Sequence, residues 1–352
     1  MKSSAVVDDA DPQIHALAVA AMSGNRRALA RLISLVEGGG AAALQAIAAL
    51  YPHTGRAQIV GVTGPPGAGK STLVCEMARA YRQSERSVGI VAVDPSSPFS
   101  GGALLGDRIR MRELSGDPEV FIRSMATRGS LGGLARATAD VTCVLDAAGY
   151  KVILVETVGA GQNEVDIGRL AHTTIVIQVP ASGDEIQAIK AGMLEIADLI
   201  VVNKADLPGA DVMVEVLEAM LGLQSPPADL HHVLDAVSPV TSKGSPSGSG
   251  DWRPRVIKTS ALRSEGIADL IEAVAAHAQY ARASGRRAAH EREYAARQLR
   301  SMLQQEMYSR FLAQIGEQEI QAAVDRIASR QEDPYSAAIR LAATCRLSAG
   351  AA

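Results

Sequence analysis

The stretch from Gly64 to Thr72 constrains the fold of this chain more than any other segment. It reads GPPGAGKST and completes the pattern G-x-x-x-x-G-K-[ST]. The apolar run IVGV at 59–62 precedes it, and a segment that favours a helix follows it. A strand, a glycine-rich loop and a helix N-terminus in this order form a phosphate-binding loop. A glycine-rich turn that matched the pattern by chance would not need a strand before it and a helix after it. The sequence therefore predicts a nucleotide-binding α/β unit.

Each residue type in this loop has a part in holding phosphate. The three glycines allow backbone conformations that a Cβ disfavours, so successive N–H groups can turn toward one anion at a helix N-terminus. We expect Lys70 to reach the β- and γ-phosphates and the hydroxyl of Ser71 to ligate Mg²⁺. The residues of the loop expected to bind nucleotide are Gly64, Gly67, Ala68, Gly69, Lys70, Ser71 and Thr72.

A second motif indicates which base is bound. Asn203-Lys204-Ala205-Asp206 follows the apolar run LIVV at 199–202. A carboxylate at Asp206 can accept hydrogen bonds from N1–H and the exocyclic amine of guanine, whereas adenine offers no such donor pair. We expect Asn203 to support the purine edge and the stem of Lys204 to cover the ring face. The sequence therefore favours GTP and GDP over ATP.

A third segment suits the other side of the base. Ser260 and Ala261 follow the apolar pair at 256–257, and a loop in this position can present a backbone N–H to the guanine oxygen. N-K-x-D alone is a weak signal, because it occurs by chance in many proteins. Behind strand-like runs and after a phosphate loop, the two segments together are specific for guanine.

Three acidic residues are candidates for the Mg²⁺ site and for hydrolysis. Asp94 ends the second strand-like run, Asp107 lies in a polar loop, and Glu156 stands where many GTPases carry the Asp of D-x-x-G. Each carboxylate could lie near one Mg²⁺ that Ser71 also ligates, or could instead cap a helix or face solvent. Gly159, three residues after Glu156, could present a backbone N–H to the γ-phosphate.

Composition excludes several other classes of protein. The formal net charge is −3, so electrostatics favour neither a nucleic-acid partner nor an anionic membrane. No apolar run approaches the ~18 residues of a membrane span, and the first residues do not resemble a signal peptide, so we expect a soluble, cytoplasmic protein. The three cysteines, at 75, 143 and 345, form no C-x-x-C and indicate neither a disulfide framework nor a thiolate metal site.

The hydrophobic pattern predicts three regions. Residues 1–52 form an N-terminal helical extension, with helices over 12–37, broken at 23–25, and over about 41–50. Residues 53–280 form a doubly wound, mostly parallel α/β domain with a mobile Ser/Gly-rich insertion at about 238–250. Residues 281–352 form a C-terminal helical region. The expected strands lie at 59–62, 88–93, 152–155, 174–179, 199–202 and 256–257.

The C-terminal region carries an apolar stripe that must pack on something. Its residues fall mostly three or four apart, as on one face of a helix. They are Leu299, Met302, Leu303, Met307, Phe311 and Leu312. The stripe could pack on its own domain, but we favour a partner subunit and predict a homodimer with a helical dimerisation arm.

Several longer strings resemble the MeaB/ArgK family, the GTPases associated with adenosylcobalamin-dependent acyl-CoA mutases, above all methylmalonyl-CoA mutase. The resemblance extends from the N-terminal helices to Tyr335, and so covers nearly the whole chain. The strings that carry it are VDPSSP at 93–98, GDRIRM at 106–111, FIRSM at 121–125, RGSLGG at 128–133 and ETVGAGQNE at 156–164.

The resemblance implies a function and further site residues. It implies a homodimeric G protein that binds the mutase, gates delivery of adenosylcobalamin and protects the mutase from inactivation. It implies mobile switch segments at 94–111, 156–164 and 183–190, with Asp94, Asp107 and Glu156 as metal-site or hydrolytic residues. Gln187 and Lys190 are implied to transmit the presence of the partner, although the residues alone would make Lys190 a solvated charge on a helix.

Three other functions remain open at this point. A kinase tied to amino-acid transport would have no use for the guanine reader at Asp206. A nickel-insertion GTPase would need Cys and His ligands that the chain lacks, and a GTPase of the ribosome or signal-recognition machinery would need a basic surface. We expect a Mg²⁺-dependent GTPase that is slow alone and is stimulated by its mutase.

Overall fold

The computed structural model describes residues 11–94, 114–126, 133–157, 163–180, 194–224 and 252–344. The chain forms two compact units, Met1–Arg287 and Ala288–Ala352. The division at residues 52 and 280 stays a prediction. The features named above that lie outside the described residues include Asp107, Gly159, Gln187, Lys190 and the segment 238–250.

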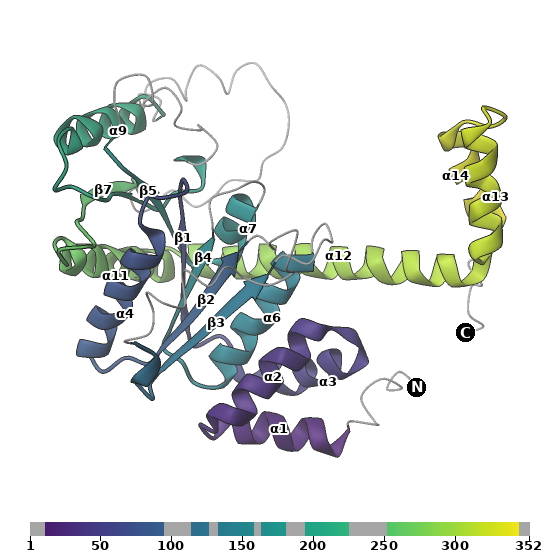
Figure 1. Ribbon diagram of the computed structural model, residues 1–352, viewed down its shortest axis with the longest axis horizontal. Helices are drawn as coiled ribbons and strands as arrows, with labels where there is room; N and C mark the ends of the chain where they lie inside the picture. The colour runs from purple at the N-terminus through teal and green to yellow at the C-terminus, as the bar shows by residue number, and fades with distance from the viewer. Residues whose placement is uncertain are drawn as a thin grey trace. The chain divides into compact units, whose positions relative to one another are not determined.

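The first unit contains a seven-stranded parallel sheet in the order β3-β2-β4-β1-β5-β6-β7 (Figure 1). The chain turns outward on one side of β1 to form β2 to β4 and on the other side to form β5 to β7, so β1 lies at the switch point of a doubly wound fold. The predicted fold class is confirmed. The strands are β1 (Gln58–Thr63), β2 (Val88–Asp94), β3 (Val120–Ala126), β4 (Val152–Thr157), β5 (Thr173–Gln178), β6 (Leu199–Val202) and β7 (Arg255–Lys258).

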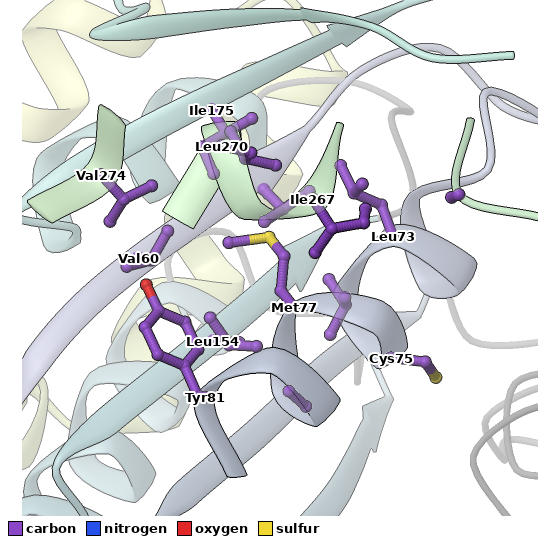
Figure 2. Packing of buried hydrophobic residues seen from close by; sticks show 14 of the residues in the cluster. Val60, Leu73, Cys75, Met77, Tyr81, Leu154, Ile175, Ile267, Leu270 and Val274 are labelled. Atoms are coloured by element: carbon purple, nitrogen blue, oxygen red, sulfur yellow. The ribbon is translucent and has the colours of Figure 1, made fainter. Parts of the chain in front are cut away.

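Alternation along the strands supplies a core to each face of the sheet. In β4, Leu154 faces a cluster with α4 (Lys70–Gln83) and α11 (Ile267–Ala283), whereas Ile153 faces a cluster with the N-terminal helices and α6 (Gly133–Ala147). Figure 2 shows Met77 of α4 between the helix α11 and the sheet. Two more helices, α7 (Asn163–Leu170) and α9 (Ala210–Gln224), complete the layers. Because both faces are covered, the central strands are continuous β-branched and aliphatic runs.

The three predicted N-terminal helices form, as α1 (Pro12–Met22), α2 (Arg26–Gly38) and α3 (Gly40–Leu50). Asn25 caps α2 by accepting hydrogen bonds from two backbone N–H groups of its first turn. The apolar face of α2 is buried, with Leu29, Leu32, Ile33 and Val36. Two short 3₁₀ helices, η1 (Tyr51–His53) and η2 (Leu114–Gly116), lie in connections.

The edge strand β3 was not among the predicted strands. Its sequence, VFIRSMA, is interrupted by Arg123 and Ser124, so it lacks a continuous apolar run. The tertiary structure explains the arginine, because the guanidinium of Arg123 forms an ion pair with Glu37 of α2. Arg26, also of α2, donates hydrogen bonds to the carbonyls of Asp117 and Pro118 just before the strand. The N-terminal helices thus provide the partners that make a polar edge strand possible.

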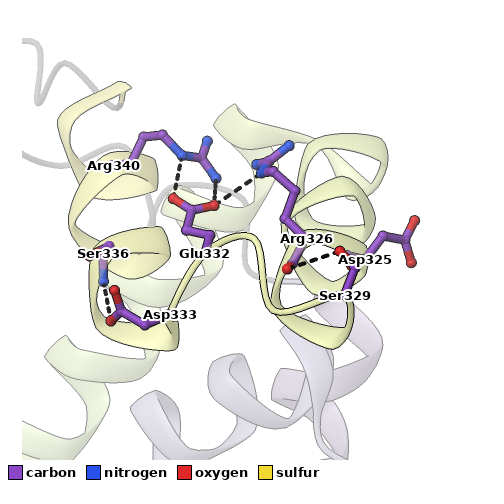
Figure 3. A network of polar contacts seen from close by, with 7 residues as sticks. All are labelled: Asp325, Arg326, Ser329, Glu332, Asp333, Ser336 and Arg340. Atoms are coloured by element: carbon purple, nitrogen blue, oxygen red, sulfur yellow. Dashed lines mark hydrogen bonds and ion pairs between the residues drawn. The ribbon is translucent and has the colours of Figure 1, made fainter.

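The second unit is helical. It contains most of α12 (Arg286–Ile315), followed by α13 (Glu317–Ala328) and α14 (Pro334–Thr344). Glu332, in the turn between α13 and α14, accepts hydrogen bonds from Arg326 and Arg340 (Figure 3). None of the described helices is both long and apolar enough to cross a membrane.

Candidate nucleotide-binding site

The loop between β1 and α4 has a backbone that only glycine allows at two positions. Gly64 has φ +148°, and a Cβ there would lie 2.4 Å from the carbonyl oxygen of Ile177. Gly69 has φ +87°, and a Cβ there would lie 2.5 Å from Nδ2 of Asn203. Both distances are far below van der Waals contact. The glycines of the motif therefore permit a close approach of the loop to β5 and to the segment after β6.

Lys70, the first residue of α4, is buried and folds back over the loop. Its Nζ donates hydrogen bonds to the carbonyl oxygens of Gly64 and Pro65, each at 2.9 Å. These contacts orient a side chain that is otherwise flexible. They hold one positive charge inside the curve of the loop, where the partial positive charge of the helix N-terminus adds to it.

Ser71 and Glu156 meet at the carboxyl edge of the sheet. The hydroxyl of Ser71 donates a hydrogen bond of 2.6 Å to Oε1 of Glu156, and both residues are buried. Glu156 comes from β4, where it lies opposite Val62 of β1 in the parallel register. The two residues are 85 positions apart in the sequence. The sheet therefore brings together a hydroxyl and a carboxylate, the oxygen ligands that Mg²⁺ prefers.

This pair fits a Mg²⁺ site that phosphate completes. The described residues contain no group of three or more His, Cys, Asp or Glu that could hold a metal ion. Mg²⁺ is commonly held by one or two carboxylates together with substrate phosphates and water, so the pair is sufficient from this side. Asp94 ends β2, whose neighbour β4 carries Glu156, so its backbone lies at the same sheet edge.

Asn203 joins the phosphate loop to the third segment. Its Nδ2 donates a hydrogen bond to the carbonyl of Ala68 at 2.7 Å. Its Oδ1 accepts from the backbone N–H of Ala261 and from the hydroxyl of Thr259, both at 3.1 Å. Because Asn203 is buried and uses both ends of its amide in this way, the structure gives it a positioning role. Its contact with a purine stays a prediction.

Asp206 is held by groups that follow β7. Oδ1 accepts a hydrogen bond of 2.7 Å from the hydroxyl of Ser260, and Oδ2 lies 3.6 Å from a guanidinium nitrogen of Arg263. The pKa of Asp206 lies below its ordinary value, first because of the hydrogen bond from Ser260 and further because of the nearby charges of Arg263 and Lys204. The carboxylate is therefore ionised at neutral pH. Lys204 itself has φ +57°, an uncommon conformation for a residue with a Cβ.

The predicted site residues that the structure describes gather at one edge of the sheet. They follow or end β1, β2, β4, β6 and β7, as expected for the ligand-binding edge of a doubly wound fold. Sequence reasoning predicted Ser260 only for its backbone and did not identify Arg263 at all. No local pattern marks either side chain as a partner of Asp206, so only the contact itself could have found them.

Comparisons with known proteins agree with this geometry. A Pyrococcus abyssi protein whose name describes it as a GTPase is 46% identical over 315 residues, and the match covers 90% of this chain and 91% of that protein. The mouse protein named methylmalonic aciduria type A homolog, mitochondrial, is 37% identical over 234 residues, covering 65% of this chain and 51% of that protein. The crystal structure of a protein named LAO/AO transport system kinase has a TM-score of 0.66 and 25% identity, covering 95% of this chain and 98% of that one.

The family itself is identified by a sequence model described as methylmalonyl Co-A mutase-associated GTPase MeaB. It matches residues 29–316, which include most of α2, the whole sheet, every segment of the candidate site and α12. With the phosphate loop, the Ser71–Glu156 pair and the held carboxylate of Asp206 at one sheet edge, this match leads to one conclusion: the chain belongs to the MeaB family of GTPases.

Proposed function

We propose that this chain is a Mg²⁺-dependent GTPase that serves an adenosylcobalamin-dependent acyl-CoA mutase, most simply methylmalonyl-CoA mutase. In this role it gates delivery of the cofactor and protects the mutase from inactivation. One observation carries the nucleotide part: Asn203 ties the phosphate loop to the segment that holds Asp206, so phosphate and base would meet one connected surface. The mutase part rests on the family description and on the name of the mouse relative.

The phosphates would bind at the loop before α4. Its backbone N–H groups would turn toward them, and Lys70 would exchange its contacts with loop carbonyls for contacts with the β- and γ-phosphates. Bound Mg²⁺ would neutralise charge on the phosphate oxygens. Ser71 and Glu156 would hold it, with Asp94 and Asp107 as the further acidic candidates. Gly159 would present its N–H to the γ-phosphate.

The base would bind at the held carboxylate. An ionised carboxylate accepts about four hydrogen bonds, and Asp206 accepts one from the hydroxyl of Ser260. Acceptor positions therefore remain for the two donors on the guanine edge. A desolvated carboxylate facing adenine would lack both partners, and this would weaken binding. Lys204 and Ala261 would complete the contacts to the base.

The partner and the assembly are proposed on other grounds. Four residues of the apolar stripe of α12, namely Leu299, Met302, Leu303 and Met307, are exposed, which supports a homodimer held by the C-terminal helices. We further propose that the protein works in the cytoplasm and binds neither nucleic acid nor membrane, in keeping with its net charge of −3. Lys190 would couple mutase binding to hydrolysis.

Calorimetry with GTP, GDP and ATP tests the nucleotide part. We expect binding of both guanine nucleotides in the presence of Mg²⁺ and much weaker binding of ATP. Equal affinity for ATP and GTP would refute the assignment of Asp206.

Steady-state phosphate release, with and without a purified adenosylcobalamin-dependent mutase, tests the partner. We expect a low rate that rises when the mutase is added and does not rise with serum albumin. Basal hydrolysis that no such mutase changes would refute the chaperone role while leaving the GTPase assignment in place.

A further inference from the structure

The loop that holds Asp206 is itself closed and braced. Ser260 and Glu265 exchange backbone hydrogen bonds at 3.1 Å in both directions, and the N–H of Arg263 donates to the carbonyl of Ser260 at 3.0 Å. The residues 260–265 therefore form a tight closed turn. Gly266, with φ +72°, follows it where a Cβ would lie 2.1 Å from the carbonyl oxygen of Lys258. The turn has little freedom to shift along the chain.

One side-chain contact anchors this turn to the helix of the phosphate loop. The hydroxyl of Ser264 donates a hydrogen bond of 2.7 Å to Oε2 of Glu76, which lies on α4. Ser264 has φ +57°, so its backbone adopts a left-handed conformation that needs support from its surroundings. Glu76 is only 11% exposed in its side chain and also forms an ion pair with Arg79 one turn further along α4. The acceptor is thus fixed in place on a rigid element.

The braced turn carries both side chains that contact Asp206. Ser260 begins the turn and binds Oδ1, and Arg263 lies within it, 3.6 Å from Oδ2. The two contacts reach different oxygens of one carboxylate, so together they restrict its rotation. Movement of the turn would therefore rotate the carboxylate away from the orientation that the two guanine donors require.

We infer that Glu76 and Ser264 are positioning residues for base recognition, and that they act through the turn at 260–265 on the carboxylate of Asp206. The inference rests on the proposed binding of guanine by Asp206. Its consequence is that α4 controls two parts of the nucleotide site, because Lys70 and Ser71 begin the helix and Glu76 lies just beyond its first turn. The fixed distance between them sets the spacing of phosphate and base sites.

Inosine diphosphate provides the test, because it lacks the exocyclic amine that one oxygen of Asp206 would accept from. In the wild-type protein we expect GDP to bind about tenfold more tightly than inosine diphosphate, the size of one charge-assisted hydrogen bond. In Ser264→Ala we expect this ratio to fall about two- to fivefold. In GTP hydrolysis KM should rise while kcat stays near its wild-type value, since the phosphate loop is unchanged.

Two further variants separate positioning from general damage. Glu76→Gln keeps an oxygen that can accept from Ser264 and should retain more of the GDP preference than Glu76→Ala. Ser284→Ala removes a hydroxyl just after the end of α11 that donates a hydrogen bond to the carbonyl of Tyr280, and should leave the ratio unchanged. Thermal unfolding of each apo variant checks that the fold is intact.

The outcomes are distinct from those of the proposed function. A wild-type protein without preference for GDP over inosine diphosphate would overturn the role of Asp206 itself. A wild-type preference that survives intact in Ser264→Ala and Glu76→Ala, or equal weakening of both nucleotides in these variants, would overturn the positioning role alone.

Discussion

The helices α4 and α12 differ in how many of their residues the chain buries. Eight of the fourteen residues of α4 are buried, whereas none of the thirty residues of α12 is buried in the single chain. Leu299, Leu303 and Met307 of α12 are each more than half exposed. Soluble monomers rarely leave a long apolar stripe uncovered. The difference shows that α4 is packed within its own unit, whereas the described helices of the second unit bury no residue of α12.

The polar residues of the two helices differ in the same way. At the N-terminus of α4, Lys70 and Ser71 are buried and bonded to residues from other elements. Along α12, the ion pairs Arg297–Glu293 and Arg310–Glu306 join residues one turn apart and face solvent. Such pairs contribute only a few tenths of a kcal/mol each. Tertiary contacts thus define α4, and local contacts dominate α12.

The largest effect is expected from the buried end of α4. Lys70→Ala removes the positive charge from the phosphate loop, and we expect the rate of GTP hydrolysis to fall by about 10³ or more, because electrostatic stabilisation dominates phosphoryl transfer. Phosphate release measures this effect. Lys151→Ala, at an exposed position just before β4, is the control and should keep the wild-type rate. Normal turnover by Lys70→Ala would show that the buried end of α4 does not contribute to hydrolysis.

The next largest effect is expected from charges placed in the exposed apolar stripe of α12. Leu299→Glu with Leu303→Glu places two charges in the exposed stripe, and we expect dimer affinity to fall about a hundredfold or more because each charge would have to be desolvated at the interface. Light scattering measures the molar mass, and GDP affinity should not change. A wild-type chain that is monomeric at micromolar concentration would contradict the proposed homodimer.

Base recognition should show a smaller effect. Asp206→Asn replaces one acceptor by a donor, so we expect GDP affinity to fall about tenfold or more and affinity for xanthosine diphosphate to rise. Calorimetry with both nucleotides provides the two numbers. Asp211→Asn, at an exposed carboxylate on α9 that pairs with Lys258, is the matched control. A fall for both nucleotides would indicate lost structure instead of altered recognition.

The smallest effect concerns the turn between α13 and α14. Hydrogen bonds from Arg340 and Arg326 lower the pKa of Glu332 to about 2. Because the folded-state pKa lies below the unfolded value of about 4.5, this group stabilises the folded unit above that value and loses its contribution as pH falls toward 2. Glu332→Gln should therefore lower the melting temperature slightly at pH 6 and hardly at all near pH 2. Thermal unfolding at pH 6 and near pH 2 measures the difference in melting temperature between the wild type and Glu332→Gln. An equal difference at the two pH values would contradict this prediction. Glu272→Gln, at an exposed position on α11, is the control and should show almost no difference at either pH.

Local sequence patterns predicted most of the elements correctly. Glycine spacing and a helix-forming segment identified the unit from β1 to α4, and apolar runs identified six of the seven strands. Strand β3 was missed because the partner of Arg123 is Glu37, which lies 86 positions away in the sequence. A pattern within one strand carries no information about such a partner.

The sequence by itself determined the fold class and the place of the phosphate-loop motif after the first strand, because glycine conformations and hydrophobic periodicity are properties of short segments. The role of Asp206 in recognising the base stays a prediction from its motif. Only the tertiary structure decided that Asn203 joins two loops and that Glu156 meets Ser71. These features depend on contacts between residues up to 135 positions apart, and such contacts exist only after the sheet has brought the carboxyl ends of its strands together.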